Sequence, residues 1–218
     1  MKPELITLFD VDNTLLDNDR VESDLRRHVR RSFGRAAERR YFEIFEELRS
    51  ELGYADYLGA LQRYRLEHPG DPYLLRMSSY LIGYPFAKRL YPGALEAIRR
   101  CRRRGPVVIL SDGDAVFQPH KVNQSGLWKA VGGKVLIFIH KEKMLAEVER
   151  LCPARHYVMV DDKLRILEAM KKVWGTRLTT VFVRQGHYAR DARNRRRYAP
   201  ADVRIDRIGD LRGSAFLS

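Results

Sequence analysis

The spacing of apolar residues divides this chain into regions of two kinds. A short run of consecutive apolar residues covers about residues 5–10. From residue 17 to about 91, apolar side chains instead recur every three or four positions, which is the spacing of one buried face of a helix. From about residue 92 onward, short apolar runs alternate with segments of helical spacing. The pattern predicts one strand, a long helical insertion, and then alternating strands and helices.

Three apolar stripes and a turn signal predict four helices in the insertion. The stripes are Val21, Leu25 and Val29, then Tyr41, Phe45, Leu48 and Leu52, then Tyr54, Tyr57, Leu58, Leu61 and Tyr64. The segment His68-Pro69-Gly70 ends the third stripe. Asp71-Pro72 predicts the start of the fourth helix, because aspartate caps helices and proline favours their first position. We expect the tyrosines of these stripes to be mainly packing residues.

Almost wholly apolar runs predict the strands of the second region. They cover residues 107–110, 135–139, 157–160 and 178–183, with a weaker candidate at 203–205. Helices are expected at residues 93–104, before the first of these strands, and at 115–124, 142–151 and 163–174 between them. Strands that are apolar on both sides belong to parallel sheets covered by helices on both faces. The predicted fold class is therefore α/β with a parallel sheet.

The composition is that of a folded globular protein. Of the 218 residues, 44% are hydrophobic and 10% are aromatic. The two cysteines, Cys101 and Cys152, form no disulfide framework and no metal-binding spacing, which fits a reducing cytosol. No apolar run approaches the length of a membrane span, and the apolar start is too short for a signal-peptide core. We expect a soluble, cytoplasmic protein that does not bind membranes.

The chain carries a formal net charge of +13, much of it from arginine. A basic surface attracts anions and can bind nucleic acid without sequence specificity. The arginines, however, occur in several small clusters that are scattered along the sequence. We therefore favour solvated helix faces as their explanation; a nucleic-acid partner stays open but is not favoured.

Two aspartates, Asp10 and Asp12, follow the first apolar run. Side chains two positions apart on an extended segment point the same way, so both would project from the carboxyl end of a buried strand. Open α/β sheets place their ligand sites at that end. Two carboxylates in one cleft repel each other unless a cation or a proton separates them, which indicates hard-metal chemistry. Alternatively, one of the two forms an Asx-type turn that caps the strand.

Chemically capable residues also follow the next three predicted strands. In chain order they are Ser111 with Asp112 and Gly113, then Lys141, then Asp161 with Asp162. A hydroxyl followed by a glycine-containing turn into a helix can hold phosphate through Oγ and backbone N–H groups. Asp161 and Asp162 again place two carboxylates directly after a buried strand, as Asp10 and Asp12 do after the first apolar run.

The segment Phe9-Asp-Val-Asp-Asn-Thr-Leu-Leu16 resembles the first motif of the haloacid dehalogenase superfamily, whose nucleophile is the first aspartate. The segments at Ser111, at Lys141 and at Asp161-Asp162 resemble the second, third and fourth motifs, in family order. The third match is the loosest, because the family lysine usually precedes a proline that this chain lacks. Lys143, and more distantly Lys134, therefore stay alternatives to Lys141.

The resemblance implies a fold and a domain organisation. The core would be a Rossmann-like, doubly wound parallel sheet formed by residues 1–16 and 92–218. Residues 17–91 would form an inserted, all-helical cap that closes over the site.

The resemblance also implies Mg²⁺-dependent phosphoryl transfer and assigns the residues. Asp10 would be the nucleophile, and Asp12 would be the general acid and base. The transferring phosphoryl group would be held by Ser111, Asp112, Gly113 and Lys141. Mg²⁺ would be bound by Asp10, the backbone carbonyl of Asp12, Asp162 and, directly or in the outer shell, Asp161.

Asp12 narrows the expected reaction. Family members that cleave carbon–halogen bonds have a non-acidic residue at this position, because a leaving halide needs no proton. The function we expect is a phosphomonoesterase that acts on a small phosphorylated metabolite through an aspartyl-phosphate. The alternatives are a phosphomutase or phosphotransferase with the same motifs, or a basic nucleic-acid-binding protein on this fold. The substrate and the oligomeric state cannot be predicted from these residues.

Overall fold

Within residues 3–71 and 74–213, which the computed structural model describes, the chain forms a six-stranded parallel sheet. The strands are β1 (Leu5–Phe9), β2 (Val107–Asp112), β3 (Val135–Phe138), β4 (His156–Asp161), β5 (Leu178–Val183) and β6 (Val203–Ile205). Their order across the sheet is β3-β2-β1-β4-β5-β6, and every neighbouring pair is parallel. The predicted α/β fold with a Rossmann-like, doubly wound parallel sheet is confirmed.

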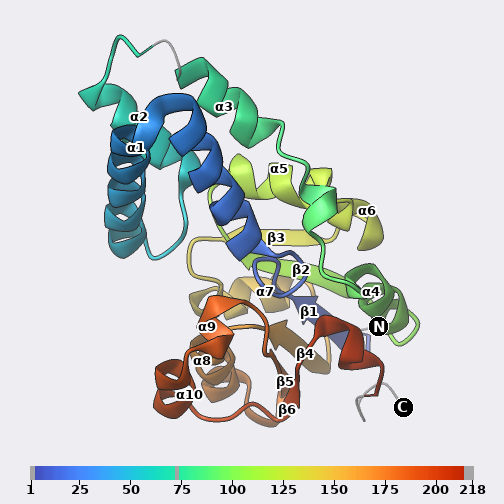
Figure 1. Cartoon of the computed structure of the whole chain (residues 1–218). Helices are drawn as coiled ribbons and strands as arrows, with labels where there is room; N and C mark the ends of the chain where they lie inside the picture. Colours follow the sequence, from blue (N-terminus) through green and yellow to red (C-terminus); the bar gives the residue numbers. More distant parts are fainter. Residues whose placement is uncertain (1–2, 72–73, 214–218) are drawn as a thin grey trace.

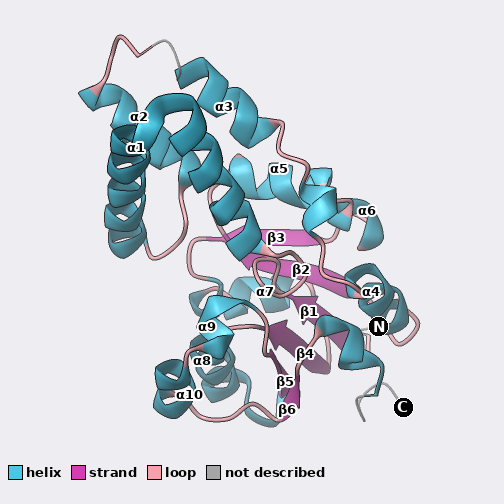
Figure 2. Ribbon diagram, viewed as in Figure 1, coloured by secondary structure: helices cyan, strands magenta, loops and turns pink. Residues whose placement is uncertain are grey.

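Helices cover both faces of this sheet (Figure 2). On one face lie α4 (Ala94–Arg102), α5 (Phe117–Gln124) and α6 (Leu127–Ala130); on the other lie α7 (Leu145–Leu151) and α8 (Leu164–Trp174). Consecutive residues of β1 pack on opposite faces of the sheet: Leu8 lies in the core that contains α8, and Phe9 lies in the core that contains α4. Burial on both faces explains why the central strands are largely apolar.

A long helical segment lies between β1 and α4. It contains α1 (Asn18–Leu52), α2 (Tyr57–Glu67), α3 (Leu74–Ile82) and the 3₁₀ turn η1 (Phe86–Arg89). The first two stripes of the sequence share α1, which is kinked at Gly34, where φ is 86°. The predicted start of the fourth helix at Asp71-Pro72 falls partly outside the described residues, because Pro72 is not among them; the described helix begins at Leu74.

The two ends of this helical segment meet each other. Leu16 and Leu90 form an isolated antiparallel bridge. The backbone N–H of Asp17 donates to the carbonyl of Arg89 at 2.8 Å, and that of Tyr91 donates to Leu15 at 2.9 Å. The chain therefore enters and leaves the helical segment at one point, a few residues after β1. In Figure 1, α1, α2 and α3 lie together as one group that is joined to the sheet near this end of β1.

Several short elements were not predicted. They are α6, α9 (Gly186–Arg190), α10 (Ala192–Arg197) and the 3₁₀ turns η1, η2 (Lys141–Lys143), η3 (Gly175–Arg177) and η4 (Ile208–Gly213). The helix expected at 142–151 begins at Leu145 because η2 occupies the residues before it. Elements of three to six residues are too short to show a repeated apolar spacing. None of the helices in the described part of the chain is long and apolar enough to cross a membrane.

Candidate active site

The carboxyl ends of neighbouring strands bring the sequence-predicted residues together. Asp10 follows β1, Ser111 and Asp112 end β2, Asp161 ends β4, and Lys141 follows β3 in η2. β1 lies between β2 and β4. Phe9 pairs with Val160 in the sheet register, so the residues that follow them, Asp10 and Asp161, are neighbours.

Three buried carboxylates crowd this edge of the sheet. Oxygens of Asp10, Asp161 and Asp162 all lie within 4.8 Å of one another. The three residues are 4%, 0% and 1% exposed. Burial is the largest influence on the pKa values of Asp161 and Asp162. It raises the pKa of Asp161 to about 6, and it raises the pKa of Asp162 well above its usual range. The carboxylates that crowd Asp10 are thus those of Asp161 and Asp162, whereas from the sequence we expected Asp12 beside Asp10.

Lys141 supplies a positive charge inside this cluster. Its Nζ lies 2.5 Å from Asp10 Oδ1, 2.8 Å from Asp161 Oδ2 and 3.3 Å from the carbonyl of Leu110. Burial alone would lower the pKa of Lys141, but Asp10, Asp161 and Asp112 outweigh it and raise that pKa above its usual value. The backbone N–H of Lys141 also donates to Asp112 Oδ1 at 2.7 Å.

The two alternative lysines lie elsewhere. Lys143 is exposed at the end of η2 and lines a cavity beside the site. Lys134 is exposed and directly precedes β3, at the amino end of that strand. The geometry therefore favours Lys141 as the lysine of the third motif, although the sequence left the choice open.

The carboxylate cluster fits a hard cation. Asp10 Oδ2 and both side-chain oxygens of Asp162 are buried and have no hydrogen-bond partner. Unpartnered buried carboxylate oxygens are costly, and such oxygens are the ligands that Mg²⁺ prefers. Asp161 is more engaged, because its Oδ1 accepts from the N–H of Lys163 at 2.8 Å and its Oδ2 lies beside Lys141. The donor atoms that fit a metal are thus those of Asp10 and Asp162.

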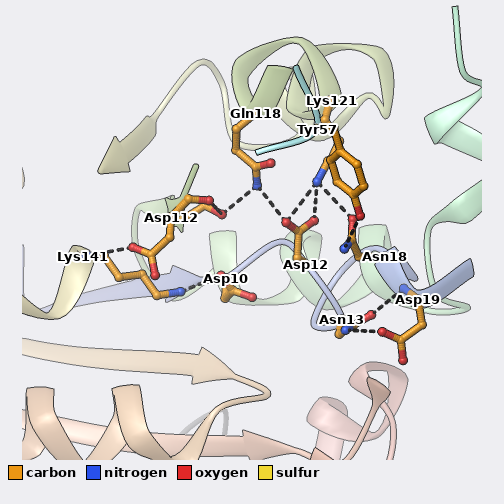
Figure 3. Close-up of polar contacts among 11 residues, drawn as sticks. Asp10, Asp12, Asn13, Asn18, Asp19, Tyr57, Asp112, Gln118, Lys121 and Lys141 are labelled. Atoms are coloured by element: carbon orange, nitrogen blue, oxygen red, sulfur yellow. Dashed lines mark hydrogen bonds and ion pairs between the residues drawn. The ribbon is translucent and has the colours of Figure 1, made fainter. Parts of the chain in front are cut away.

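Asp12 turns to different partners (Figure 3). Its Oδ1 and Oδ2 lie 2.7 and 3.0 Å from Nζ of Lys121, a buried residue of α5. Nε2 of Gln118, on the same helix, lies 3.4 Å from Asp12 Oδ2 and donates to Ser111 Oγ at 2.9 Å. Our sequence analysis assigned no role to Gln118 or Lys121. Their i, i+3 spacing on the helix after Ser111 is the signal that could have pointed to them.

The loop after Asp10 is fastened to α9. Asn13 has a left-handed backbone conformation with φ of 61°, and its Nδ2 donates to Asp19 Oδ1 at 2.8 Å. The other carboxylate oxygen of Asp19 accepts from the N–H of His187 at 2.8 Å. A Cβ on Gly186 would lie 2.5 Å from Cβ of Asn13, so this close approach requires glycine. The position of the loop therefore depends on a helix that the sequence pattern did not predict.

Two adjoining cavities lie beside these residues. The smaller, of about 70 Å³, is lined by Asp12 and Asp112 of the core and by Asn18 and Tyr57 of the helical segment, among others. The larger, of about 460 Å³, is lined by residues that include Asp162. Both share Arg49, Gly53, Lys163 and Tyr188. Their lining brings the helical segment and the strand ends together around one space.

Lys163, like Lys121, is a lysine of the site to which the sequence analysis assigned no role. Its Nζ lies 5.2 Å from the ring centroid of Tyr188. Burial would lower the pKa of Lys163, but the charges of Asp162, Asp10 and Asp161 raise it overall. Lys163 therefore adds positive charge on the side of the cluster where Asp162 lies.

Comparisons with known proteins identify the family and the fold. Residues 6–173 match the family model of haloacid dehalogenase-like hydrolases. A haloacid dehalogenase-like hydrolase from Burkholderia xenovorans LB400 is 66% identical, with a TM-score of 0.94 over 97% of this chain and 99% of that one. A search of curated proteins gave no match.

Two more distant structures share the fold. The magnesium-bound HAD hydrolase YfnB of Bacillus subtilis is 16% identical, with a TM-score of 0.64, and the alignment covers 97% of this chain and 98% of that one. An L-2-haloacid dehalogenase of Xanthobacter autotrophicus is 19% identical, with a TM-score of 0.62 over 99% and 100% of the two chains.

The crowding of the carboxylates leads to a prediction for Asp162→Asn. Removing one buried, unpartnered charge should raise the melting temperature of the metal-free protein at pH 7.5 by about 2–4 °C, the shift that roughly 1 kcal/mol produces in a protein of this size. We also expect Mg²⁺ to stabilise the wild-type protein, and this stabilisation should largely disappear in the variant. Thermal unfolding with EDTA or with MgCl₂ measures both effects.

The matched control for this prediction is Asp206→Asn, which changes an aspartate whose side chain is exposed and paired with Arg184 at 3.0 Å. It should leave the melting temperature and the response to Mg²⁺ nearly unchanged, because exposed ion pairs contribute little. If Asp162→Asn kept the full response to Mg²⁺, Asp162 would not be a ligand.

Proposed function

The chain belongs to the haloacid dehalogenase-like hydrolase family, and within that family we propose that it is a Mg²⁺-dependent phosphomonoesterase. It removes the phosphoryl group from a small phosphorylated metabolite through an aspartyl-phosphate. The observation that carries this proposal is the division of labour between two aspartates. Asp10 lies buried beside Lys141, whereas Asp12 faces the small cavity and is held by other groups.

Asp12 argues for an ester rather than a carbon–halogen bond as the substrate. The alkoxide that leaves a phosphate ester needs a proton, and an acidic side chain two residues after the nucleophile can supply it. A leaving halide needs none. The dehalogenase of Xanthobacter shares the fold at 19% identity, which says nothing about the reaction of this chain.

Asp10 is the proposed nucleophile. In the first step one of its carboxylate oxygens bonds to phosphorus while the ester P–O bond breaks, and the leaving oxygen takes a proton from Asp12. In the second step a water attacks phosphorus, gives its proton to Asp12, and the bond to Asp10 breaks to release inorganic phosphate. Lys141, at 2.5 Å from Asp10, offsets the repulsion between the carboxylate and the incoming phosphate.

Ser111 and the turn after it are proposed to hold the phosphoryl oxygens. Ser111 Oγ is buried and accepts from Gln118, while its own proton makes only a long contact of 3.4 Å with the carbonyl of Asp112, which a phosphoryl oxygen would replace. The backbone N–H groups of Asp112 and Gly113 would add donors at the same strand end. Most of the stabilisation of phosphoryl transfer comes from positioning and from charge of this kind.

The metal is proposed to be Mg²⁺, held by carboxylate oxygens of Asp10 and Asp162 and by the backbone carbonyl of Asp12. When bound, it supplies positive charge that offsets the repulsion between phosphate and carboxylates. Asp161 is proposed to act mainly by holding Lys141, with a direct bond to the metal left open.

Residues 17–91 are proposed to form a cap over a catalytic core made of residues 1–16 and 92–218. The cap residues Asn18 and Tyr57 line the small cavity together with Asp12, so the cap would exclude water from the reacting groups. Both connections pass through the Leu16–Leu90 bridge, which could serve as a hinge.

The basic charge is more consistent with solvated surfaces than with a nucleic-acid site. Several arginines of the helical segment are already paired with glutamates. The pairs include Arg40 with Glu67, Arg63 with Glu51 and Arg30 with Glu38. We therefore propose a small phosphorylated substrate as the partner and the cytoplasm as the location. A mutase or phosphotransferase would use the same residues and differ in how well the cap excludes water.

Asp10→Asn should abolish hydrolysis of p-nitrophenyl phosphate, because it removes both the nucleophile and a proposed ligand. We expect kcat to fall by at least about 10⁴-fold, on the scale expected when covalent catalysis is lost. Circular dichroism should show an unchanged fold. Activity within about tenfold of wild type would exclude the covalent mechanism.

Asp12→Asn should slow dephosphorylation more than the first step. An aryl leaving group needs little protonation, whereas the attacking water still needs a base. Aspartyl-phosphate should therefore accumulate, and rapid acid quenching should trap phosphate on the protein. If both steps slowed equally and no phosphoprotein could be trapped, the role of Asp12 as acid and base would be wrong.

Lys141→Ala and Lys143→Ala form a matched pair. Lys141→Ala should lower kcat by about 10²-fold or more, as expected when a charge beside the transition state is lost. Lys143→Ala should change kcat by less than about threefold, because exposed charges are screened by water. The reverse order would place the third-motif lysine two residues later.

A further inference from the structure

We infer that Lys121 is a positioning residue for the reaction: it fixes the carboxylate of Asp12 and ties it to the first turn of the cap. This inference rests on the proposed function, because it takes Asp12 as the group that moves protons. It adds a residue that lies on α5, outside the strand ends that carry the four motifs.

Each N–H donor of the Lys121 ammonium has an acceptor within hydrogen-bond distance. Lys121 is 1% exposed, and its Nζ lies within hydrogen-bond distance of Asp12 Oδ1 at 2.7 Å, Asp12 Oδ2 at 3.0 Å and Asn18 Oδ1 at 3.2 Å. An ammonium has three N–H donors, so these three acceptors use all of them. A buried ammonium is costly unless it is paired, so the side chain is held where Asp12 is.

Contact with both oxygens fixes the orientation of the Asp12 carboxylate. A carboxylate held through one oxygen can still rotate about its last side-chain bond, whereas two bonds to one ammonium restrict that rotation. The Asp12 side chain is 22% exposed and lines the small cavity, so its free side is turned toward the space for substrate. Lys121 thus binds the Asp12 carboxylate without closing the side that lines the cavity.

The third acceptor comes from the proposed cap (Figure 3). Asn18 is the first residue of α1, and its Nδ2 approaches the hydroxyl of Tyr57, the first residue of α2, at 3.5 Å. Movement of α1 away from the core would take one acceptor from a buried ammonium. The position of Asp12 is therefore coupled to the seating of α1.

Gln118 extends the same arrangement to the phosphoryl site. It lies three residues before Lys121 on α5, so both side chains share one face of that helix. It contacts Asp12 Oδ2 at 3.4 Å and Ser111 Oγ at 2.9 Å. A Cβ on Gly113 would lie 2.5 Å from Cβ of Gln118, which shows how closely α5 packs on the turn after Ser111. The helix sets the distance between the acid/base group and the phosphate-binding hydroxyl.

A double-mutant cycle tests the inference, with p-nitrophenyl phosphate and Mg²⁺ and the variants Lys121→Met, Asp12→Asn and both together. Lys121→Met should lower kcat by roughly 30-fold or more with KM changed by less than about threefold, because only transition-state geometry is affected. In the Asp12→Asn background it should change kcat by less than about twofold, since residues that act as a unit are not additive. Lys121→Arg, which keeps the charge, should recover part of the loss.

The control is Lys129→Met on the exposed face of α6, which should leave kcat near wild type. An equal cost of Lys121→Met in both backgrounds would overturn the inference, because Lys121 would then not act through Asp12. If Lys121→Met failed to fold, Asn18→Ala would replace it. That variant should lower kcat by about three- to tenfold in the wild-type background and have little effect in Asp12→Asn; an equal effect in both would again be a contradiction.

A second measurement separates this inference from the proposed function. If the wild-type protein hydrolysed no phosphate ester, the proposed function would fail by itself. Hydrogen exchange then tests whether Lys121 restrains the loop that carries Asp12. Backbone amides of residues 11–18 should exchange faster in Lys121→Met than in Lys129→Met. Equal exchange in these two variants would overturn the inference.

Discussion

Repulsion among three buried carboxylates is the constraint on which the rest of this site depends. The parallel register that pairs Phe9 with Val160 makes Asp10 and Asp161 neighbours, and Asp162 follows immediately. One ammonium, that of Lys141, enters the cluster from the end of β3. Lys163 adds positive charge on the other side, yet both side-chain oxygens of Asp162 are left without a hydrogen-bond partner. Those unpartnered oxygens are the reason that we propose a divalent cation at this site.

The two aspartates of the first motif are separated by the partners they meet. β1 ends at Phe9, so Asp10 still lies in the plane of the strand ends, whereas Asp12 has entered the loop. Lys141 forms an ion pair with Asp10, and Lys121 forms one with Asp12. The two lysines come from elements that are distant from β1 along the chain. Two carboxylates two residues apart can then do different chemistry, because each is placed in a different electrostatic environment.

The sequence predicted the parts of this arrangement that are set by local pattern. Apolar runs marked the strands, and the polar residues at their ends identified Asp10, Ser111 and Asp162 as candidates. It assigned no role to Lys121, because the spacing of Gln118 and Lys121 on one helix does not by itself show that Lys121 contacts Asp12, 109 residues away in the sequence. It did not predict α9, since five residues show no period, yet that helix holds the loop after Asp10 through His187. Contacts between distant segments carry no signal in a single sequence.

The helical segment contacts the core at several places, which include Ile82 with His120 and Tyr57 with Phe117. One group of contacts lies where the chain enters the segment. The Leu16–Leu90 bridge, the Lys121–Asn18 contact and the Asp19–His187 contact all involve the last residues before α1 or its first turn. The last turn of α1 contributes Arg49, whose guanidinium lies over the ring of Tyr188 at 5.1 Å from its centroid. Because α1 is kinked at Gly34, this last turn also lines the two cavities beside the strand ends. A movement of the proposed cap would therefore change the cavity walls at Arg49 as well as the contact between Asn18 and Lys121, which in turn holds Asp12.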